Sequence, residues 1–217
     1  MKEPYVKPDN ITMKTSLWKK ELATYDVRGM KHNCTSSALL VVDMQNYFLS
    51  ENCGAWMAAT PAILPNVCRL VDAFRGAGRP VIFTTHVHEN LEKDGGMMAE
   101  WWQELIMKGT FDAEMFAAFD PRDNEKVIKK TRYSAFFDTD LDSYLVSLGV
   151  KELVISGVMT NLCCESTARD AFFRDYRVFF IMDATAAVSE EFHLSSLRNL
   201  AYGFAAITDA GTILESF

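Results

Sequence analysis

The amino-acid sequence predicts an α/β fold of three layers, α/β/α, in which helices cover both faces of a six-stranded, mostly parallel, doubly wound sheet. The first observation is that short, continuous apolar runs alternate with segments in which apolar residues recur at helical spacing. The second is that glycine or proline stands at the ends of many of these segments. Strands that alternate with helices pair in parallel and bury both faces of their sheet.

The start of the chain differs from the rest, because residues 1–35 mix charges with Pro4, Pro8 and a patch around Trp18. We predict an N-terminal arm here, with one helical turn packed on the body. Residues 36–217 are predicted to form a single domain. The whole chain of 217 residues, 49% of them hydrophobic, can bury a full core.

Most of the predicted strands are short apolar runs, whereas residues 125–130 hold Val127 and Ile128 between charged side chains. The predicted helices carry apolar residues three and four positions apart. Strands are expected at residues 38–42, 81–85, 125–130, 154–155, 177–182 and 205–208. Helices are expected at residues 61–77, 138–148 and 190–202, and from the cysteine pair to residue 174. Residues 91–123 follow no regular pattern and are rich in aromatic side chains, so we expect a pocket wall or lid there.

Chemically useful side chains follow several of these strands. Asp43 comes directly after the first strand, His86 and His88 after the second, and Lys130 at the end of the third. Cys163 lies shortly after the fourth. In open parallel sheets ligands bind at the carboxyl ends of the strands, so these residues mark the expected site.

Residues 156–170 hold two adjacent thiols, Cys163 and Cys164, where a buried strand turns into a helix. The first amides of a helix lack intrahelical partners and carry the positive end of its dipole, which lowers a thiol pKa and stabilises an oxyanion. Thr160 or Asn161 is expected to cap this helix. Position alone does not choose between the two cysteines.

The composition of the chain limits the classes of molecule that it is expected to bind. A net charge of -7, from 29 acidic and 22 basic residues, argues against nucleic acid and anionic membranes, which leaves small molecules or other subunits. The N-terminus has charges and proline where a signal peptide needs an apolar run, so we expect a cytoplasmic protein. Five irregularly spaced cysteines predict neither a disulfide framework nor a structural zinc site.

Four motifs occur in an order that resembles the isochorismatase-like cysteine hydrolase family. They are Leu-Val-Val-Asp-Met-Gln at 40–45, Lys-Thr-Arg-Tyr-Ser-Ala-Phe at 130–136, Gly-Val-Met-Thr-Asn-Leu-Cys at 157–163 and Thr-Ala-Arg-Asp-Ala at 167–171. Members that hydrolyse the vinyl ether of isochorismate lack the cysteine. The resemblance therefore implies hydrolysis of a C–N bond in a small amide, closest to members acting on ureido or carbamoyl compounds.

The resemblance also implies roles. Asp43 would be the general acid/base, Lys130 the cation that favours the thiolate, and Cys163 the nucleophile, since the family places it three residues after the threonine of Gly-Val-x-Thr. The Val158-Met159 peptide would be cis, and the amides of Met159 and Cys163 would form the oxyanion hole. The family needs no cofactor for this chemistry and commonly forms homodimers or homotetramers.

Nicotinamidases of the same superfamily carry Asp-x-His and a further histidine as metal ligands. Here His86-x-His88 stands at that place without a convincing third ligand, so no metal is predicted. For these two histidines substrate contact and ordinary packing both remain open. The predicted substrate-binding residues, chosen to supply polar contacts and apolar walls for a flat amide, are Phe48, His86, His88, Trp102, Tyr133 and Phe136.

Two other functions fit the same sequence. One is isochorismatase-type vinyl-ether hydrolysis, which would survive loss of the thiol. The other is a non-catalytic member of the fold that binds a small molecule. Arg169 and Asp170 are interpreted as a structural ion pair that supports the cysteine turn.

Overall fold

The computed structural model describes residues 3–25 and 28–217. Its centre is one six-stranded sheet of order β3-β2-β1-β4-β5-β6, in which every pairing is parallel. The sheet is therefore wholly parallel, where the sequence predicted a mostly parallel one. The strands are β1 (Ser37–Val42), β2 (Val81–His86), β3 (Lys126–Lys130), β4 (Glu152–Val158), β5 (Arg177–Ala186) and β6 (Ala206–Thr208).

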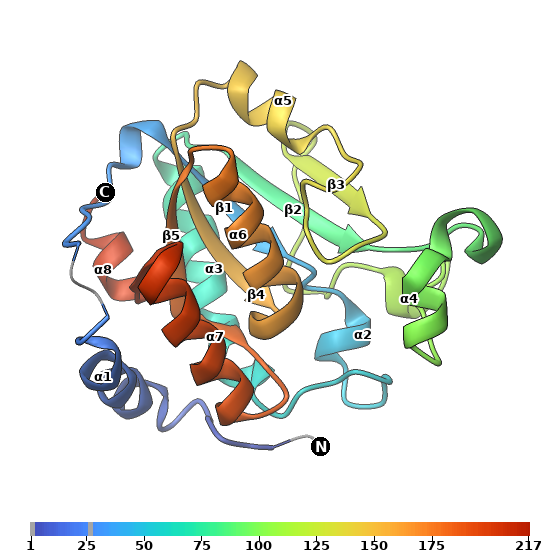
Figure 1. Ribbon diagram of the computed structural model, residues 1–217, viewed down its shortest axis with the longest axis horizontal. Coiled ribbons are helices and arrows are strands. Elements are labelled where there is room, and N and C mark those ends of the chain that lie inside the picture. The colour runs from blue at the N-terminus through green and yellow to red at the C-terminus, as the bar shows by residue number, and fades with distance from the viewer. Residues whose placement is uncertain (1–2, 26–27) are drawn as a thin grey trace.

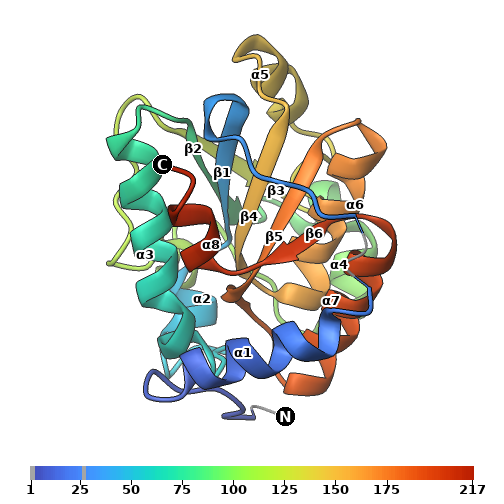
Figure 2. The ribbon, with the colours of Figure 1, turned by 90° about the vertical axis from the view of Figure 1, so that its left-hand side faces the viewer.

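Helices cover both faces of this sheet, as Figures 1 and 2 show. The helix α3 contacts β1, β2 and β5 and lies beside α8 on one face, while α6 and α7 lie together on the other. The helices are α1 (Ile11–Leu22), α2 (Asn46–Leu49), α3 (Thr60–Gly76), α4 (Gly96–Trp101), α5 (Leu141–Ser147), α6 (Glu165–Phe173), α7 (Glu190–Gly203) and α8 (Ala210–Leu214). The predicted three-layer α/β class is confirmed.

The N-terminal segment holds more structure than one helical turn. Helix α1 has 12 residues and contacts α7 and β5, and the side chains of Trp18 and Leu22 are buried against the body. The sequence prediction was wrong on this length, because the apolar face of α1 is narrow and its other positions are polar. The division into an arm at 1–35 and a domain at 36–217 stays a prediction.

Two further differences concern the C-terminal half. Strand β5 continues to Ala186, past the expected end at residue 182, because the polar Asp183 is itself buried and accepts a hydrogen bond from the Ala210 amide. Helix α8 was not predicted, since five residues are too few to show a helical period.

The two central strands approach one another closely at the end that carries the site. Val42 pairs with Gly157, whose φ of 107° is a conformation that side chains disfavour. A Cβ at Gly157 would lie 2.1 Å from the Val42 carbonyl oxygen, so only glycine fits between β1 and β4 here.

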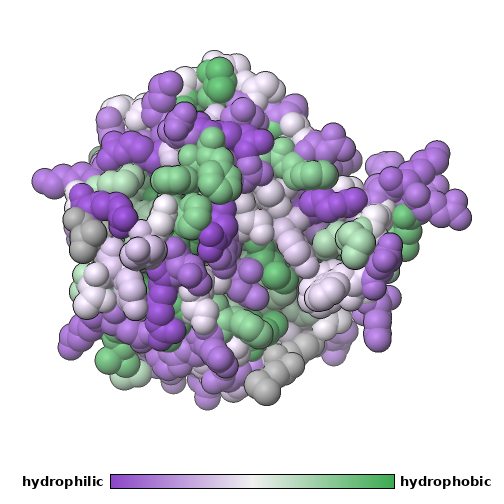
Figure 3. All heavy atoms as spheres, in the orientation of Figure 1, coloured by the Kyte–Doolittle hydropathy of each residue, from purple (hydrophilic) through white to green (hydrophobic). Residues whose placement is uncertain are grey.

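The molecular surface is mixed. On the face shown in Figure 3, hydrophilic side chains predominate and apolar ones are interspersed among them. Within the described ranges, no helix has the length and apolar character needed to cross a membrane.

Candidate active site

Asp43, Lys130 and Cys163 meet at the carboxyl edge of the sheet, as their strand-end positions predicted. Asp43 follows β1, Lys130 is the last residue of β3, and Cys163 lies between β4 and α6. Lys130 Nζ lies 2.7 Å from Asp43 Oδ2 and 3.2 Å from Cys163 Sγ. A carboxylate oxygen of Asp43, a ring nitrogen of His86 and Cys163 Sγ all lie within 4.8 Å of one another.

The Asp43–Lys130 ion pair is buried, with exposed fractions of 0% and 1% for the two residues. The Thr84 hydroxyl donates to Asp43 Oδ1 at 2.6 Å, and Lys130 Nζ also donates to the Arg132 carbonyl at 3.1 Å. Buried charges are tolerated only when their partners neutralise them and accept or donate hydrogen bonds. The pair is therefore fixed in place, and removal of either partner would leave an uncompensated charge.

Burial decides the protonation of the thiol. It raises the pKa of Cys163 to about 12; the Lys130 ammonium lowers it in part, and the Asp43 carboxylate raises it further. Burial alone would lower the pKa of Lys130, but Asp43 and Cys163 outweigh it and raise that pKa. The sequence-based expectation of a lowered thiol pKa is thus wrong for this geometry, and Cys163 rests as a neutral thiol beside an ammonium ion.

The turn that carries Cys163 has an irregular start. The Val158-Met159 peptide is cis, as the family resemblance implied. Residues Thr160–Cys164 form one π-helical turn before α6, and its N-cap is Met159 rather than Thr160 or Asn161. The amides of Leu162 and Cys164 donate to the Met159 carbonyl at 3.1 Å each, and the Cys163 amide between them is not part of that pair.

A buried histidine, His193, contacts the turn that carries Cys163. His193 of α7 and Thr160 are fully buried, and their Nδ1 and Oγ1 atoms are 2.9 Å apart. The rings of Trp18 and Tyr5, both in the N-terminal segment, lie 4.8 and 5.8 Å from the imidazole. Burial lowers the pKa of His193 to about 4, so the imidazole is neutral at pH 7.

Beside Lys130, two histidines form a chain of short contacts. His86 Nδ1 lies 3.2 Å from Lys130 Nζ, His86 Nε2 lies 3.2 Å from His88 Nε2, and His88 Nδ1 lies 3.1 Å from Asp94 Oδ1. The ammonium can only donate, so His86 Nδ1 accepts, its Nε2–H donates to His88, and His88 donates to Asp94. Burial and the Lys130 charge lower the pKa of His86 to about 2, which keeps its ring neutral.

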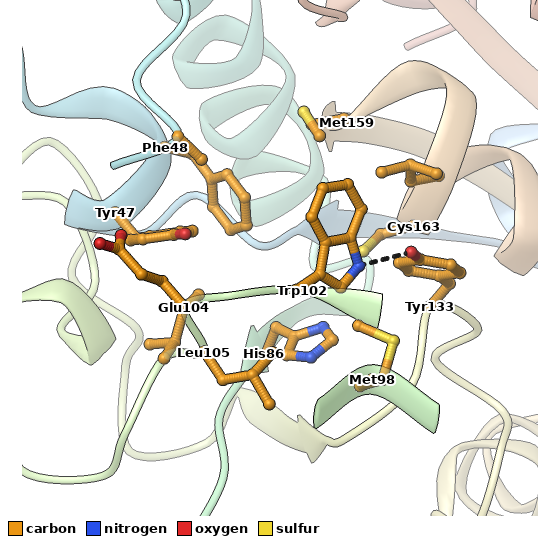
Figure 4. Close-up of a pocket in the computed structure, with 13 residues that line it drawn as sticks. Tyr47, Phe48, His86, Met98, Trp102, Glu104, Leu105, Tyr133, Met159 and Cys163 are labelled. Atoms are coloured by element: carbon orange, nitrogen blue, oxygen red, sulfur yellow. Dashed lines mark hydrogen bonds between the residues drawn. The ribbon is translucent and has the colours of Figure 1, made fainter. Parts of the chain in front are cut away.

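A small, mostly apolar cavity of about 90 Å³ opens in front of Cys163 (Figure 4). Cys163 and Tyr133 lie at one end, and Tyr47 and Glu104 lie at the other. Trp102 Nε1 donates to the Tyr133 hydroxyl at 2.8 Å across the cavity. The lining consists of Tyr47, Phe48, Ala55, His86, Met98, Trp102, Glu104, Leu105, Ile106, Tyr133, Met159, Leu162 and Cys163.

The segments that carry Asp43, Lys130 and Cys163 lie within one domain that matches a known family. The model of the isochorismatase domain matches residues 37–212, which is most of the chain. The chain belongs to the isochorismatase family. The recognition from four sequence motifs is thereby confirmed.

Three relatives place the chain within the isochorismatase family. It is 43% identical to Nicotinamidase 3 of Arabidopsis thaliana over 195 residues, which cover 88% of this chain and 94% of the relative. It is 33% identical to ureidoacrylate amidohydrolase RutB of Serratia proteamaculans, over 83% of this chain and 82% of the relative. It is also 36% identical to a probable inactive nicotinamidase of Arabidopsis thaliana, covering 79% and 91%.

Solved structures of the isochorismatase family superpose well on this fold. A cysteine hydrolase from Pseudomonas syringae pv. phaseolicola gives a TM-score of 0.82 at 29% identity and covers 86% of this chain and 94% of its own. N-carbamoylsarcosine amidase from Thermoplasma acidophilum gives a TM-score of 0.70 at 27% identity, over 83% of this chain and 97% of its own.

A metal site of the kind expected in nicotinamidases does not fit these residues. In the part of the chain that the structure describes, only Asp43, His86 and Cys163 form a group of three possible metal ligands. That space already holds the Lys130 ammonium, within 3.2 Å of all three residues. His88 Nε2 lies 3.2 Å from His86 Nε2, but within the described residues no group of three possible ligands includes His88.

Four of the six predicted substrate-binding residues line the cavity, namely Phe48, His86, Trp102 and Tyr133. His88 does not, because it lies behind His86 and is fully buried. Phe136 does not either, because its ring stacks on Tyr176, 6.0 Å between centroids. Their placement does not support direct contact with a ligand in this cavity.

Sequence reasoning did not single out Tyr47 or Glu104, which also line the cavity, although Glu104 lies in the stretch 91–123 that was expected to form a pocket wall. Arg169 and Asp170 do not pair with each other, contrary to expectation. Arg169 binds Glu165 and Asp170 binds Arg174, each at the i,i+4 spacing of one helix face.

Proposed function

We propose that this protein is a cysteine-dependent hydrolase of a C–N bond in a small amide, with Asp43, Lys130 and Cys163 as its catalytic residues. The observation that carries the proposal is that Cys163 lines a small apolar cavity while its Sγ contacts the buried Lys130–Asp43 pair. Relatives named as nicotinamidase, ureidoacrylate amidohydrolase and N-carbamoylsarcosine amidase support an amide substrate.

The first half-reaction follows from the protonation states. Because Cys163 rests as a thiol, its attack on the amide carbonyl carbon must be coupled to transfer of the S–H proton to the Asp43 carboxylate. A C–S bond forms, and the carbonyl oxygen becomes an oxyanion that the amides of Met159 and Cys163 would bind. The C–N bond then breaks as Asp43 returns the proton to the leaving nitrogen.

The second half-reaction regenerates the thiol. Water attacks the thioester carbonyl while Asp43 takes its proton, the C–S bond breaks, and the sulfur is reprotonated from Asp43. Lys130 stays an ammonium ion throughout and offsets whichever of Asp43 and the sulfur is negative. These steps require only side chains and backbone amides of this protein, water and substrate, so the proposed mechanism needs no cofactor.

Phe48, His86, Trp102 and Tyr133 are proposed to contact the substrate, with the aromatic rings as walls for a flat amide. Location and assembly remain proposals as well: a cytoplasmic enzyme that forms a homodimer or homotetramer. The relatives differ in the chemistry of their named substrates, since nicotinamide is neutral whereas ureidoacrylate and N-carbamoylsarcosine carry a carboxylate.

The deciding experiment compares Cys163→Ala with Cys164→Ala. Both remove a buried thiol, but only Cys163 lines the cavity. Turnover of a panel of small amides, followed as released ammonia or amine, should vanish in Cys163→Ala and persist in Cys164→Ala. A mass increase on Cys163 during turnover should reveal the thioester. Retained turnover in Cys163→Ala would refute the proposal, and a wild-type protein that turns over no amide would favour the binding alternative.

A further inference from the structure

The electrostatic character of the cavity depends on one side chain. Among the lining residues, all within the described part of the chain, Glu104 alone carries a formal charge at pH 7. The lining imidazole of His86 is neutral, because burial and Lys130 lower its pKa to about 2. Behind the wall, the charges of Asp43 and Lys130 cancel at 2.7 Å, and Cys163 is a thiol.

Glu104 is an exposed side chain whose carboxylate lies over Gly54 at the border of the cavity. Its Oε2 lies 2.8 Å from where a Cβ of Gly54 would be, so the missing side chain of Gly54 leaves the space that the carboxylate occupies. The ring of Tyr47 borders the same space, and Glu104 is among the charges that raise the pKa of Tyr47, after burial. Figure 4 shows Glu104 and Tyr47 at the end of the cavity away from Cys163.

A substrate whose carbonyl reaches Cys163 Sγ extends its other end toward Glu104. An anion at that end would meet a carboxylate across a weakly polar cavity, with no cation on the lining to compensate it. The two negative charges repel each other in a cavity of low polarity, and such repulsion lowers the affinity for an anionic substrate relative to a neutral one. A neutral end loses nothing, and an N–H donor or a cation gains an acceptor.

We propose that Glu104 is a specificity-determining residue that admits neutral or cationic amides to the site and rejects amides that carry a carboxylate. The proposal rests on the proposed function for its biological meaning. Its physical content, the charge preference of the cavity around Cys163, can be measured independently of any amide turnover. Two unit charges about 6 Å apart at an effective dielectric of 40 to 80 alter binding by roughly three- to tenfold.

The test uses two iodoacetamide reagents that share a leaving group and differ in charge at the end away from the reacting carbon, N-iodoacetylglycinamide and N-iodoacetylglycine. The rate of alkylation of Cys163 is followed by peptide mass spectrometry for the wild type, Glu104→Gln, Glu104→Lys and the control Glu215→Gln. Glu215 is exposed, lies outside this cavity and carries the same charge. The ratio of the two rates cancels any common change in thiol reactivity.

We expect the ratio of the N-iodoacetylglycinamide rate to the N-iodoacetylglycine rate to fall by about three- to tenfold in Glu104→Gln, and further in Glu104→Lys. Glu215→Gln should keep the wild-type ratio. An unchanged ratio in both Glu104 variants would overturn the proposal. If the ratio shifts while no amide is turned over, the charge selection stands and the proposed hydrolase function fails, so the two outcomes are distinguishable.

Discussion

Asp43→Asn should separate two properties that usually change together, turnover and thiol reactivity. The substitution keeps the shape of the side chain but removes the carboxylate that must accept the thiol proton. Turnover should therefore fall by about 10²- to 10⁴-fold, the usual contribution of a general acid/base. Alkylation of Cys163 by iodoacetamide should instead become faster, because the neighbouring negative charge that raises its pKa is gone.

The size of the second effect follows from the geometry. An Asp43 oxygen and Cys163 Sγ lie within 4.8 Å. At an effective dielectric of about 20, a carboxylate at that separation destabilises a thiolate by about 3 kcal/mol. Its removal increases the thiolate fraction on the order of a hundredfold at neutral pH. Since a less basic thiolate is also a weaker nucleophile, the alkylation rate should rise by about tenfold.

The assay needs a folding control, because loss of one partner from a buried ion pair costs about 3–5 kcal/mol. Circular dichroism and a urea melt establish that Asp43→Asn is folded under the labelling conditions. Asp183→Asn is the matched control, since Asp183 is also a buried aspartate, but its carboxylate accepts a hydrogen bond from the Ala210 amide and is not paired with Lys130. Slower labelling in folded Asp43→Asn, or turnover near the wild-type rate, would refute this account of Cys163.

Two further predictions concern stability. Gly157→Ala should destabilise the fold by more than about 4 kcal/mol and yield mainly insoluble protein, because its Cβ would lie 2.1 Å from the Val42 carbonyl oxygen. Gly203→Ala is the control, since no atom lies near its Cβ position. A soluble Gly157→Ala protein with the wild-type melting temperature would contradict this account of the packing. His193, with its pKa lowered from 6.5 to about 4, contributes stability that is present above pH 6.5 and is lost as the pH falls toward 4. Urea melts should show that wild-type protein loses roughly 2 kcal/mol more than His193→Gln between pH 7 and 5, and parallel pH dependence in the two proteins would show that His193 is not held neutral.

The sheet was predictable because its inner strands β1, β2, β4 and β5 are buried on both faces and contain continuous apolar runs. The ends of elements were less predictable where a polar residue is buried, as at Asp183, or where a helix is short, as in α8. The irregular stretch at 91–123 was expected to form a pocket wall, and Met98, Trp102, Glu104, Leu105 and Ile106 do line the cavity.

The candidate site was predictable only in part. Strand-end positions and motif spacing bring together Asp43, Lys130 and Cys163, and these are the residues that meet in the structure. The protonation state of Cys163 was not predictable, because helix position suggests a low pKa while burial, visible only in three dimensions, raises it. Phe136 was misplaced for a related reason, since a motif gives the position of a residue but not the direction of its side chain.

Of the three residues of the candidate site, Lys130 alone is carried by an edge strand, β3. This strand pairs only with β2 within the described chain, and its side chains alternate between buried and partly or fully exposed. Edge elements with few neighbours open locally at lower free energy than the centre of a sheet. Lys130, the last residue of β3, would leave with it, while Asp43 and Cys163 would stay, because they follow the central strands β1 and β4. A local opening of β3 would therefore remove the cation from the buried Asp43 carboxylate before the central strands separate.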